Sequence, residues 1–197
     1  LIARNLNSEE KHEEALEFLR KANALDPNNA AIISSIAVTL DRLGRFDEAS
    51  ELADTFYSLY GKKLNCSFFN WNYSLDLLRR GKLELGFDLY NWRKVEIQNL
   101  HRFHTPSMIY SDAIKDDSTV LVHMEQGFGD IILFSRFLKD FKKEFNIKTL
   151  ILECHLPIMS LLMSSFGDVV DIFYAFGTGV GQPYSFDYHI SIADIPY

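Results

Sequence analysis

A helical pattern that returns after 34 residues constrains the fold of this chain more than any other feature of its sequence. Glu14-Ala15 and Glu48-Ala49 occupy equivalent places in two segments whose apolar residues recur at helical spacing. A repeated unit of this length cannot bury its apolar face alone and becomes stable when it stacks on similar neighbours. Residues 1–100 are therefore predicted to form an array of paired helices.

The period of 34 residues is that of the tetratricopeptide repeat, and the middle unit of the array resembles this repeat position by position. The unit starts after Asp26-Pro27, and Leu43-Gly44-Arg45 forms the turn between its two helices. Positions expected to face inward are apolar or small, namely Ile33, Ile36, Ala37, Leu40, Phe46, Ala49, Leu52, Ala53 and Phe56. Counting back one period places Leu1 inside a first helix, so we expect the chain to be a fragment.

A third unit departs from the regular period. The pattern predicts a first helix over Phe69–Arg80, a turn at Gly81 and a second helix over Leu83–Glu96. Gly81 follows Gly44 by 37 residues, and Gly86 replaces the small alanine of the preceding unit. The second helix is also rich in aromatic residues, which are Phe87, Tyr90 and Trp92. Because helical aromatic stripes usually belong to a core, we favour packing against a following domain over a groove for a peptide or sugar.

The overall composition is that of a water-soluble globular protein, with 47% apolar residues and a net charge of −7. An acidic chain without a dense cluster of lysine and arginine is not expected to bind nucleic acid. No apolar run reaches the roughly 20 residues that span a bilayer. Cys66 and Cys154 lie in separate predicted units, which gives no support to a disulfide framework and favours a reducing cytoplasm.

Residues 101–117 are polar and rich in turn-forming residues, which predicts a linker. His101 and His104 have a spacing that suits a metal ion, but no neighbouring side chain completes a set of ligands. We therefore expect solvated loop histidines and no metal site.

Beyond the linker, short apolar strands alternate with helical segments. Strands are predicted over 119–124, 149–154, 169–174 and 188–192, and helices over 131–145 and 157–166. Continuous apolar runs such as the one within 149–154 indicate strands covered on both faces, which is typical of a parallel sheet with right-handed crossovers. Residues 118–197 are therefore predicted to form a Rossmann-like half-domain, and the whole chain an α plus α/β protein.

The first loop between a strand and a helix of this segment contains Glu125, Gln126, Gly127, Phe128, Gly129 and Asp130. Ligands of parallel sheets bind beyond the carboxyl ends of the strands, and glycines let backbone N–H groups approach a ligand oxygen there. A dinucleotide fits poorly, although Glu153 stands near the place of a ribose-binding acid. The third glycine of the fingerprint would fall at Ile132, and the Asp130 carboxylate would repel a pyrophosphate.

Asp130 itself has two interpretations that the residues alone leave open. At the start of a helix, its carboxylate is well placed to accept hydrogen bonds from backbone N–H groups. In a desolvated site with bound substrate, the same carboxylate would serve as a general base for a hydroxyl nucleophile.

Several motifs in this order resemble a known bacterial family. They are the repeats, the end of the last repeat at 86–93, the segment 125–137, the strand and histidine at 150–155, and the segment 186–196. The chain resembles tetratricopeptide-containing glycosyltransferase-like proteins whose catalytic part is similar to the ADP-heptose:lipopolysaccharide heptosyltransferases. The resemblance implies a glycosyltransferase B fold, in which two Rossmann-like domains transfer a sugar from a nucleotide donor to an acceptor hydroxyl without a metal ion or other cofactor.

The resemblance also implies roles for residues of the loop. Asp130 takes the position of the catalytic base in the acceptor-side domain, and Glu125, Gln126, Gly127, Phe128 and Gly129 shape the substrate-binding loop around it. A second Rossmann-like domain that binds the donor is expected in this family but is not found in these residues. We therefore expect this chain to be catalytically incomplete. A protein partner is expected to bind through the repeats, and nucleotide sugar and acceptor are expected to bind to the full-length protein. The alternative is a non-catalytic tetratricopeptide module for protein–protein interaction.

Overall fold

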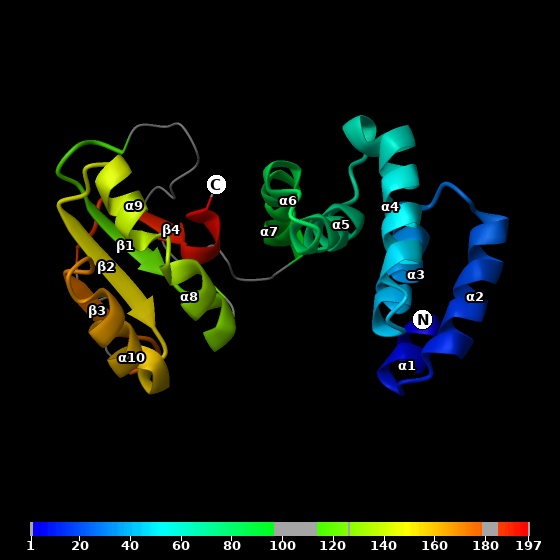
Figure 1. The fold of residues 1–197 in the computed structure, drawn as a ribbon, viewed down its shortest axis with the longest axis horizontal. Coiled ribbons are helices and arrows are strands. Elements are labelled where there is room, and N and C mark those ends of the chain that lie inside the picture. The colour runs from blue at the N-terminus through cyan, green and yellow to red at the C-terminus, as the bar shows by residue number, and fades with distance from the viewer. Residues whose placement is uncertain (1, 97–113, 126, 179–184, 197) are drawn as a thin grey trace. The chain divides into compact units, whose positions relative to one another are not determined.

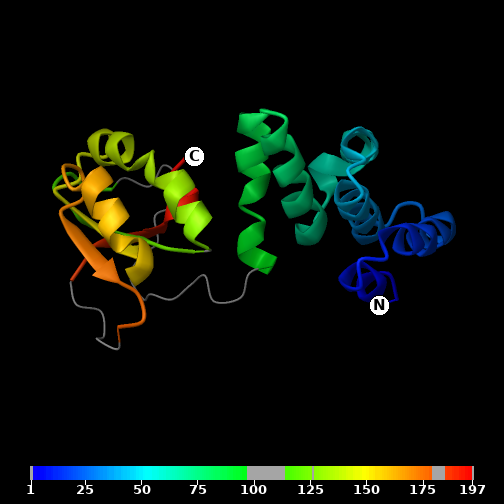
Figure 2. The same cartoon turned by 60° about the horizontal axis from the view of Figure 1, so that its bottom comes forward.

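The computed structural model describes the chain over residues 2–96, 114–125, 127–178 and 185–196 (Figure 1). The chain divides into two compact units, Leu1–Gln98 and Asn99–Tyr197, which we call the repeat unit and the sheet unit. The repeat unit is helical, and the sheet unit is built on parallel strands (Figures 1 and 2). The predicted α plus α/β class is confirmed.

The helices of the repeat unit follow one another in pairs. Their bounds are α1 Ile2–Ser8, α2 His12–Leu25, α3 Ala30–Arg42, α4 Phe46–Tyr60, α5 Ser67–Arg79, α6 Leu83–Tyr90 and α7 Arg93–Glu96. Within each pair the two helices pack together, and α3 also packs on α2 and α5. A short 3₁₀ helix, Gly61–Lys63, lies between α4 and α5, where the third unit gains its additional residues.

The turns inside the three pairs share one backbone conformation. A residue in the left-handed region occupies the same place in each turn: Glu10 (φ 61°), Gly44 (φ 74°) and Gly81 (φ 74°). The next residue donates its N–H to a carbonyl five residues earlier at 2.9 Å in all three turns, with pairs Lys11–Leu6, Arg45–Leu40 and Lys82–Leu77. This bond closes the end of the first helix of each pair. The repeated sequence thus gives a repeated backbone, even where glycine is replaced by Glu10.

Two clusters of buried side chains hold the helix pairs together. One joins α2, α3 and α4 through Leu16, Leu19, Ile36, Leu40 and Ala49. The other joins α3, α4, α5 and α6 through Ile33, Ala53, Phe56, Phe69, Tyr73, Leu77 and Leu89. Trp92 packs on this second cluster, so the aromatic end of the last repeat contributes to the core of the repeat unit itself.

Phe46 does not face inward as the repeat pattern predicts. It is the first residue of α4, its side chain is 44% exposed, and the Arg79 guanidinium lies 4.7 Å from its ring centroid. A residue at the start of a helix extends past the neighbouring helix that would otherwise cover it. The cation above the ring compensates in part for this exposure.

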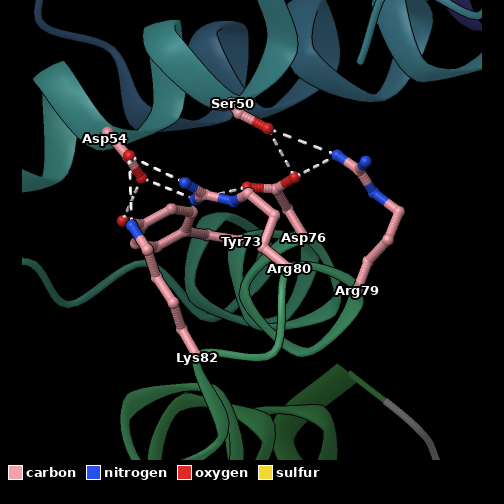
Figure 3. Close-up of polar contacts among 7 residues, drawn as sticks. All are labelled: Ser50, Asp54, Tyr73, Asp76, Arg79, Arg80 and Lys82. Carbon is pink, nitrogen blue, oxygen red and sulfur yellow. Dashed lines mark hydrogen bonds and ion pairs between the residues drawn. The ribbon is translucent and has the colours of Figure 1, made fainter. Parts of the chain in front are cut away.

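A polar network joins α4 to α5 (Figure 3). Arg80 donates two hydrogen bonds to the Asp54 carboxylate, at 2.9 and 2.7 Å, and the Tyr73 hydroxyl donates a third at 2.6 Å. Ser50 donates to Asp76 at 2.7 Å, and Asp76 also pairs with Arg79 and Arg80. The Arg80 guanidinium, followed by the Tyr73 hydroxyl, holds the pKa of the Asp54 carboxyl well below its usual range. Burial raises the pKa of the Tyr73 hydroxyl, and its hydrogen bond to Asp54 raises it further.

Over the residues that the structure describes, the sheet unit contains four parallel strands in the order β3-β2-β1-β4. Its elements are β1 Thr119–His123, α8 Phe128–Ser135, α9 Leu138–Glu144, β2 Thr149–Cys154, α10 Leu156–Phe166, β3 Ile172–Ala175, β4 Tyr188–Ser191 and the 3₁₀ helix η2 Ile192–Asp194. On one face of the sheet, four side chains are fully buried, namely Val120, Val122, Leu150 and Leu152. On the opposite face, Leu121 and Ile151 are almost fully buried. The two central strands are therefore covered on both sides, as their continuous apolar sequences predict.

Two predicted helices are interrupted. The segment 131–145 forms α8 and α9, which are separated at Arg136-Phe137, and the segment 83–96 forms α6 and α7, which are separated at Asn91-Trp92. At each break the backbone N–H of the aromatic residue bonds to a carbonyl three residues earlier, at 3.1 Å. This tighter turn changes the helix direction, which the apolar pattern alone does not reveal.

Aspartates fix the starts of the two central strands. Asp171, before β3, accepts a hydrogen bond from Leu150 N–H at 2.7 Å and returns its own N–H to the Leu150 carbonyl at 3.0 Å. Asp187, before β4, makes the same pair of bonds with Thr119 at 2.8 and 2.9 Å. The sequence predicts a strand over 169–174, but β3 begins only after Asp171, three residues later than expected. These bonds set the register of β3 and β4.

Candidate functional site

The carboxyl ends of all four strands lie at one edge of the sheet, as parallel pairing requires. The chain leaves this edge through Glu125 after β1, His155 after β2, Phe176 after β3 and Ser191 at the end of β4. We call this region the carboxyl edge. It is the part of an open parallel sheet where ligands bind.

A hydrogen bond across the carboxyl edge joins β1 to β4. The Ser191 hydroxyl donates to the Glu125 carboxylate, and its oxygen also accepts the backbone N–H of Ala193 at 3.2 Å, at the start of η2. Glu125 is half-buried. The sequence places Glu125 in the loop, but its serine partner lies 66 residues later, inside the segment 186–196, and was not predicted as a site residue.

Asp130 occupies the first turn of α8. Its carboxylate oxygen Oδ2 accepts the backbone N–H of Gly127 at 3.1 Å, so the helix-start interpretation of this residue describes its contact in the structure. Oδ1 accepts no hydrogen bond from the described residues. The side chain is half-buried. A role as general base remains a prediction.

The two glycines of the loop are not required by the fold. Neither has a left-handed backbone, and Gly127 has extended angles (φ −76°, ψ 179°). A Cβ atom at Gly129 would meet nothing within 4 Å, and one at Gly127 would meet only Asp130 Oδ2 at 3.9 Å. What the two glycines provide is uncovered backbone next to Asp130.

Phe128 projects from the first position of α8 with 45% of its surface exposed. Its ring contacts that of His155, with centroids 4.9 Å apart and planes at 64°. Gln126 lies outside the described residues. Ile132, which replaces the third glycine of a dinucleotide fingerprint, is 47% exposed, and the Glu153 carboxylate is buried within β2.

Other reactive side chains give no further site in the part of the chain that the structure describes. Within those residues, no group of three His, Cys, Asp or Glu side chains gathers to hold a metal ion. His101 and His104 lie outside the described residues. Burial raises the pKa of the Cys154 thiol to about 11, so this group stays protonated at neutral pH and is a poor nucleophile.

The repeat unit has a groove of about 990 Å³. Residues of α1, α2, α3, α5 and α7 line it, namely Ile2, Ala3, Arg4, Asn7, Ser8, Phe18, Leu19, Ala22, Ala31, Ile32, Ser35, Val38, Arg42, Phe68, Asn72 and Glu96. Three of these helices, α1, α3 and α5, are the first members of their pairs. The groove therefore runs along equivalent helices of successive repeats.

The groove combines apolar side chains with two arginines. Phe18 is 45% exposed there, beside the partly buried Ile32 and Phe68. Arg42 donates only a long hydrogen bond, 3.4 Å, to a backbone carbonyl, and neither Arg4 nor Arg42 has a carboxylate partner among the described side chains. The two guanidinium groups are thus available to a ligand, and the groove also carries one carboxylate, that of Glu96, which accepts the Ser67 hydroxyl.

Comparison with protein families agrees with the helical array. Residues 6–55, from α1 into α4, match the family described as tetratricopeptide repeat. A comparison with curated proteins found no match. Over the described ranges, no helix combines the length and the hydrophobicity needed to cross a bilayer. The match supports a protein-interaction module in the first part of the chain.

Proposed function

We propose that the repeat unit binds a segment of a partner protein in its groove. The observation that carries this proposal is the groove itself, which is lined by the first helices of three successive pairs. Stacked repeats create extended surfaces of this kind, and such surfaces suit extended or helical peptides. The tetratricopeptide match over residues 6–55 supports the same function.

The side chains of the groove favour an acidic, amphipathic segment. Phe18 and Phe68 offer apolar contact, while Arg4 and Arg42 offer cationic donors that no described carboxylate neutralises. Carboxylates are the partners that a guanidinium binds best, since two parallel hydrogen bonds can form. A basic segment would meet repulsion from the same two arginines.

Peptide selection on the purified chain tests this function. A random displayed library of 12-residue peptides is expected to yield sequences rich in Asp, Glu and large apolar residues. Arg42→Glu should weaken binding of a selected, fluorescently labelled peptide at least about tenfold, which corresponds to about 1.4 kcal/mol. The control Arg20→Glu makes the same charge change on an exposed residue of α2 that does not line the groove. Equal affinities for wild type and Arg42→Glu would refute the proposal.

A second candidate function concerns the sheet unit, as the acceptor side of a glycosyl-transfer site. The sequence resemblance described above supports it, together with the open glycine loop and the two carboxylates, Glu125 and Asp130, at the carboxyl edge. In this reaction the acceptor oxygen bonds to the anomeric carbon while the bond from that carbon to the nucleotide phosphate breaks. The diphosphate leaves with the bonding electrons, and the hydroxyl proton passes to the Asp130 carboxylate.

This second function requires a donor-binding domain that we expect in a longer protein. Nucleotide-sugar turnover by that protein would test it, with Asp130→Asn expected to reduce the rate by about 10²-fold or more, the scale of a lost general base. The asparagine oxygen can still accept the Gly127 N–H, so the helix start is preserved. The matched control is Asp140→Asn on α9. Unchanged turnover in Asp130→Asn would leave the sheet unit as a non-catalytic part of an interaction protein.

A further inference from the structure

Three aromatic rings from three different strand ends lie in a row at the carboxyl edge. Phe128 follows β1, His155 follows β2 and Phe176 follows β3. The His155 ring is 4.9 Å from that of Phe128 and 6.0 Å from that of Phe176, and both contacts have edge-to-face geometry, at 64° and 85°. We call Phe128, His155 and Phe176 the aromatic row.

The aromatic row is not accounted for by the core of the sheet unit. Phe128 and Phe176 are 45% and 44% exposed, so a large part of each ring faces solvent. His155 stands at the N-cap of α10, but its side chain makes no capping bond there. Its ring nitrogens form no hydrogen bond with the described residues, so they are available to a ligand.

The surroundings of the row narrow the chemistry of such a ligand. Glu125 and Asp130, from the same loop as Phe128, place carboxylates at this edge and disfavour a phosphate or another anion. Aromatic faces pack against flat apolar surfaces, while the imidazole and carboxylates need hydrogen-bond partners. A pyranose has both features, since its C–H groups form an apolar face and its hydroxyls lie around the rim.

We propose that the aromatic row is a subsite for a neutral pyranose ring, which packs on Phe128 and Phe176 and bonds through its hydroxyls to His155. The inference deepens the second candidate function and rests on it, because it gives the chemical class of the acceptor. It adds His155 after β2 and Phe176 after β3, neither of which was among the site residues predicted from the sequence.

Saturation-transfer NMR on the 197-residue chain tests the subsite without any turnover. The probes are methyl glycosides of glucose, galactose, mannose and N-acetylglucosamine, with AMP and choline as anionic and cationic comparison ligands. At least one glycoside is expected to receive saturation. Phe128→Ala and Phe176→Ala should each reduce that signal at least fivefold. Phe128→Leu and Phe176→Leu, which keep apolar bulk but lack an aromatic face, should reduce it as well.

Phe46→Ala is the matched control, because Phe46 is equally exposed, at 44%, and lies in the repeat unit. It should leave the signal unchanged. Asp140→Asn, an exposed change on α9, should also leave it unchanged. Because this measurement involves no turnover, a failure of turnover in the longer protein while the glycoside still binds would remove only the second candidate function. The subsite is refuted if no glycoside receives saturation, if the leucine and alanine variants bind as the wild type does, or if AMP or choline responds to these variants instead.

Discussion

The groove of the repeat unit is lined by equivalent helices, whereas the carboxyl edge of the sheet unit is assembled from four unlike strand ends. The hydrogen bonds that hold the elements together also differ between the two units. In the repeat unit, α4 and α5 are joined by bonds between side chains, such as Asp54 with Arg80. In the sheet unit, strands are held by bonds from side chain to backbone, such as Asp171 with Leu150. A surface made by repetition needs only local packing, but a surface at a sheet edge needs the complete strand order.

The largest effects should come from the two cores. Leu77 in α5 and Leu150 in β2 are both fully buried, and truncation of either to alanine should lower the free energy of unfolding by about 3 kcal/mol. Urea denaturation measures the loss, and amide hydrogen exchange locates it. If each unit is stabilised by its own core, Leu77→Ala increases amide exchange in the repeat helices, and Leu150→Ala increases it in the strands. Loss of protection throughout the chain in either variant would contradict it.

The next effect concerns the backbone anchor of β2. Asp171→Ala removes the acceptor of Leu150 N–H and of the Lys142 ammonium, which lies 2.7 Å from the same carboxylate oxygen. A strand donor left without its partner should cost about 1–2 kcal/mol in urea denaturation. Asp168→Ala is the control, because Asp168 is an exposed aspartate just before β3 with no such bond. Equal stabilities of the two variants would show that the anchor does not contribute.

A smaller effect is expected from the side-chain network of the repeat unit. Asp54→Asn should cost about 1 kcal/mol at neutral pH, a value kept low because Asp54 is 39% exposed and solvent screens its ion pair with Arg80. Since folding lowers the pKa of Asp54, its contribution is full above the unfolded pKa of about 3.9 and is lost as the pH falls through and below that value.

The stability advantage of the wild type over Asp54→Asn should therefore fall progressively as the pH is lowered from about 5 to about 2, and part of it should remain at the lower limit. Free energies of unfolding at several pH values in this range give the measurement, and Glu51→Gln, an exposed change on the same helix, is the control. An advantage that is independent of pH would mean that the Asp54 charge is not what joins α4 to α5.

The smallest effect tests the shared turn of the repeats. Glu10 holds the left-handed conformation that Gly44 holds in the next turn, so Glu10→Gly should stabilise the repeat unit by up to about 1 kcal/mol. Gly44→Ala should destabilise it by about as much. Thermal unfolding of both variants should show shifts of opposite sign. Shifts of the same sign would mean that the turns are not equivalent.

Much of the fold could be predicted because its signals are local. The 34-residue period gave the helix pairs, and continuous apolar runs gave parallel strands, with β2 correct at both ends. The predictions that were wrong concern two helices that are interrupted and the burial of Phe46. Hydrogen bonds to carbonyls three residues back interrupt two helices, and Phe46 is exposed because it begins α4.

The candidate sites were less accessible to sequence analysis. The loop 125–130 could be found from its glycines and its position after a strand. His155 and Ser191 fall inside segments that carry the family resemblance, but neither they nor Phe176 could be assigned to a site, because only the strand order brings them to the same edge. The groove of the repeat unit was likewise not predicted in detail, since exposed residues such as Phe18 and Arg42 follow no apolar pattern.

The bond between Glu125 and Ser191 has a consequence for synthesis of the chain on a ribosome. The two residues are 66 positions apart, so at about 5–20 residues per second the carboxylate is made several seconds before its partner. During that interval β4 is missing, and the side of β1 that later pairs with it is an open strand edge. The repeat unit, whose contacts are mainly between neighbouring helices, can already be folded by then. Of the four described strands, β4 emerges last, and its pairing with β1 brings Ser191 to Glu125 at the carboxyl edge.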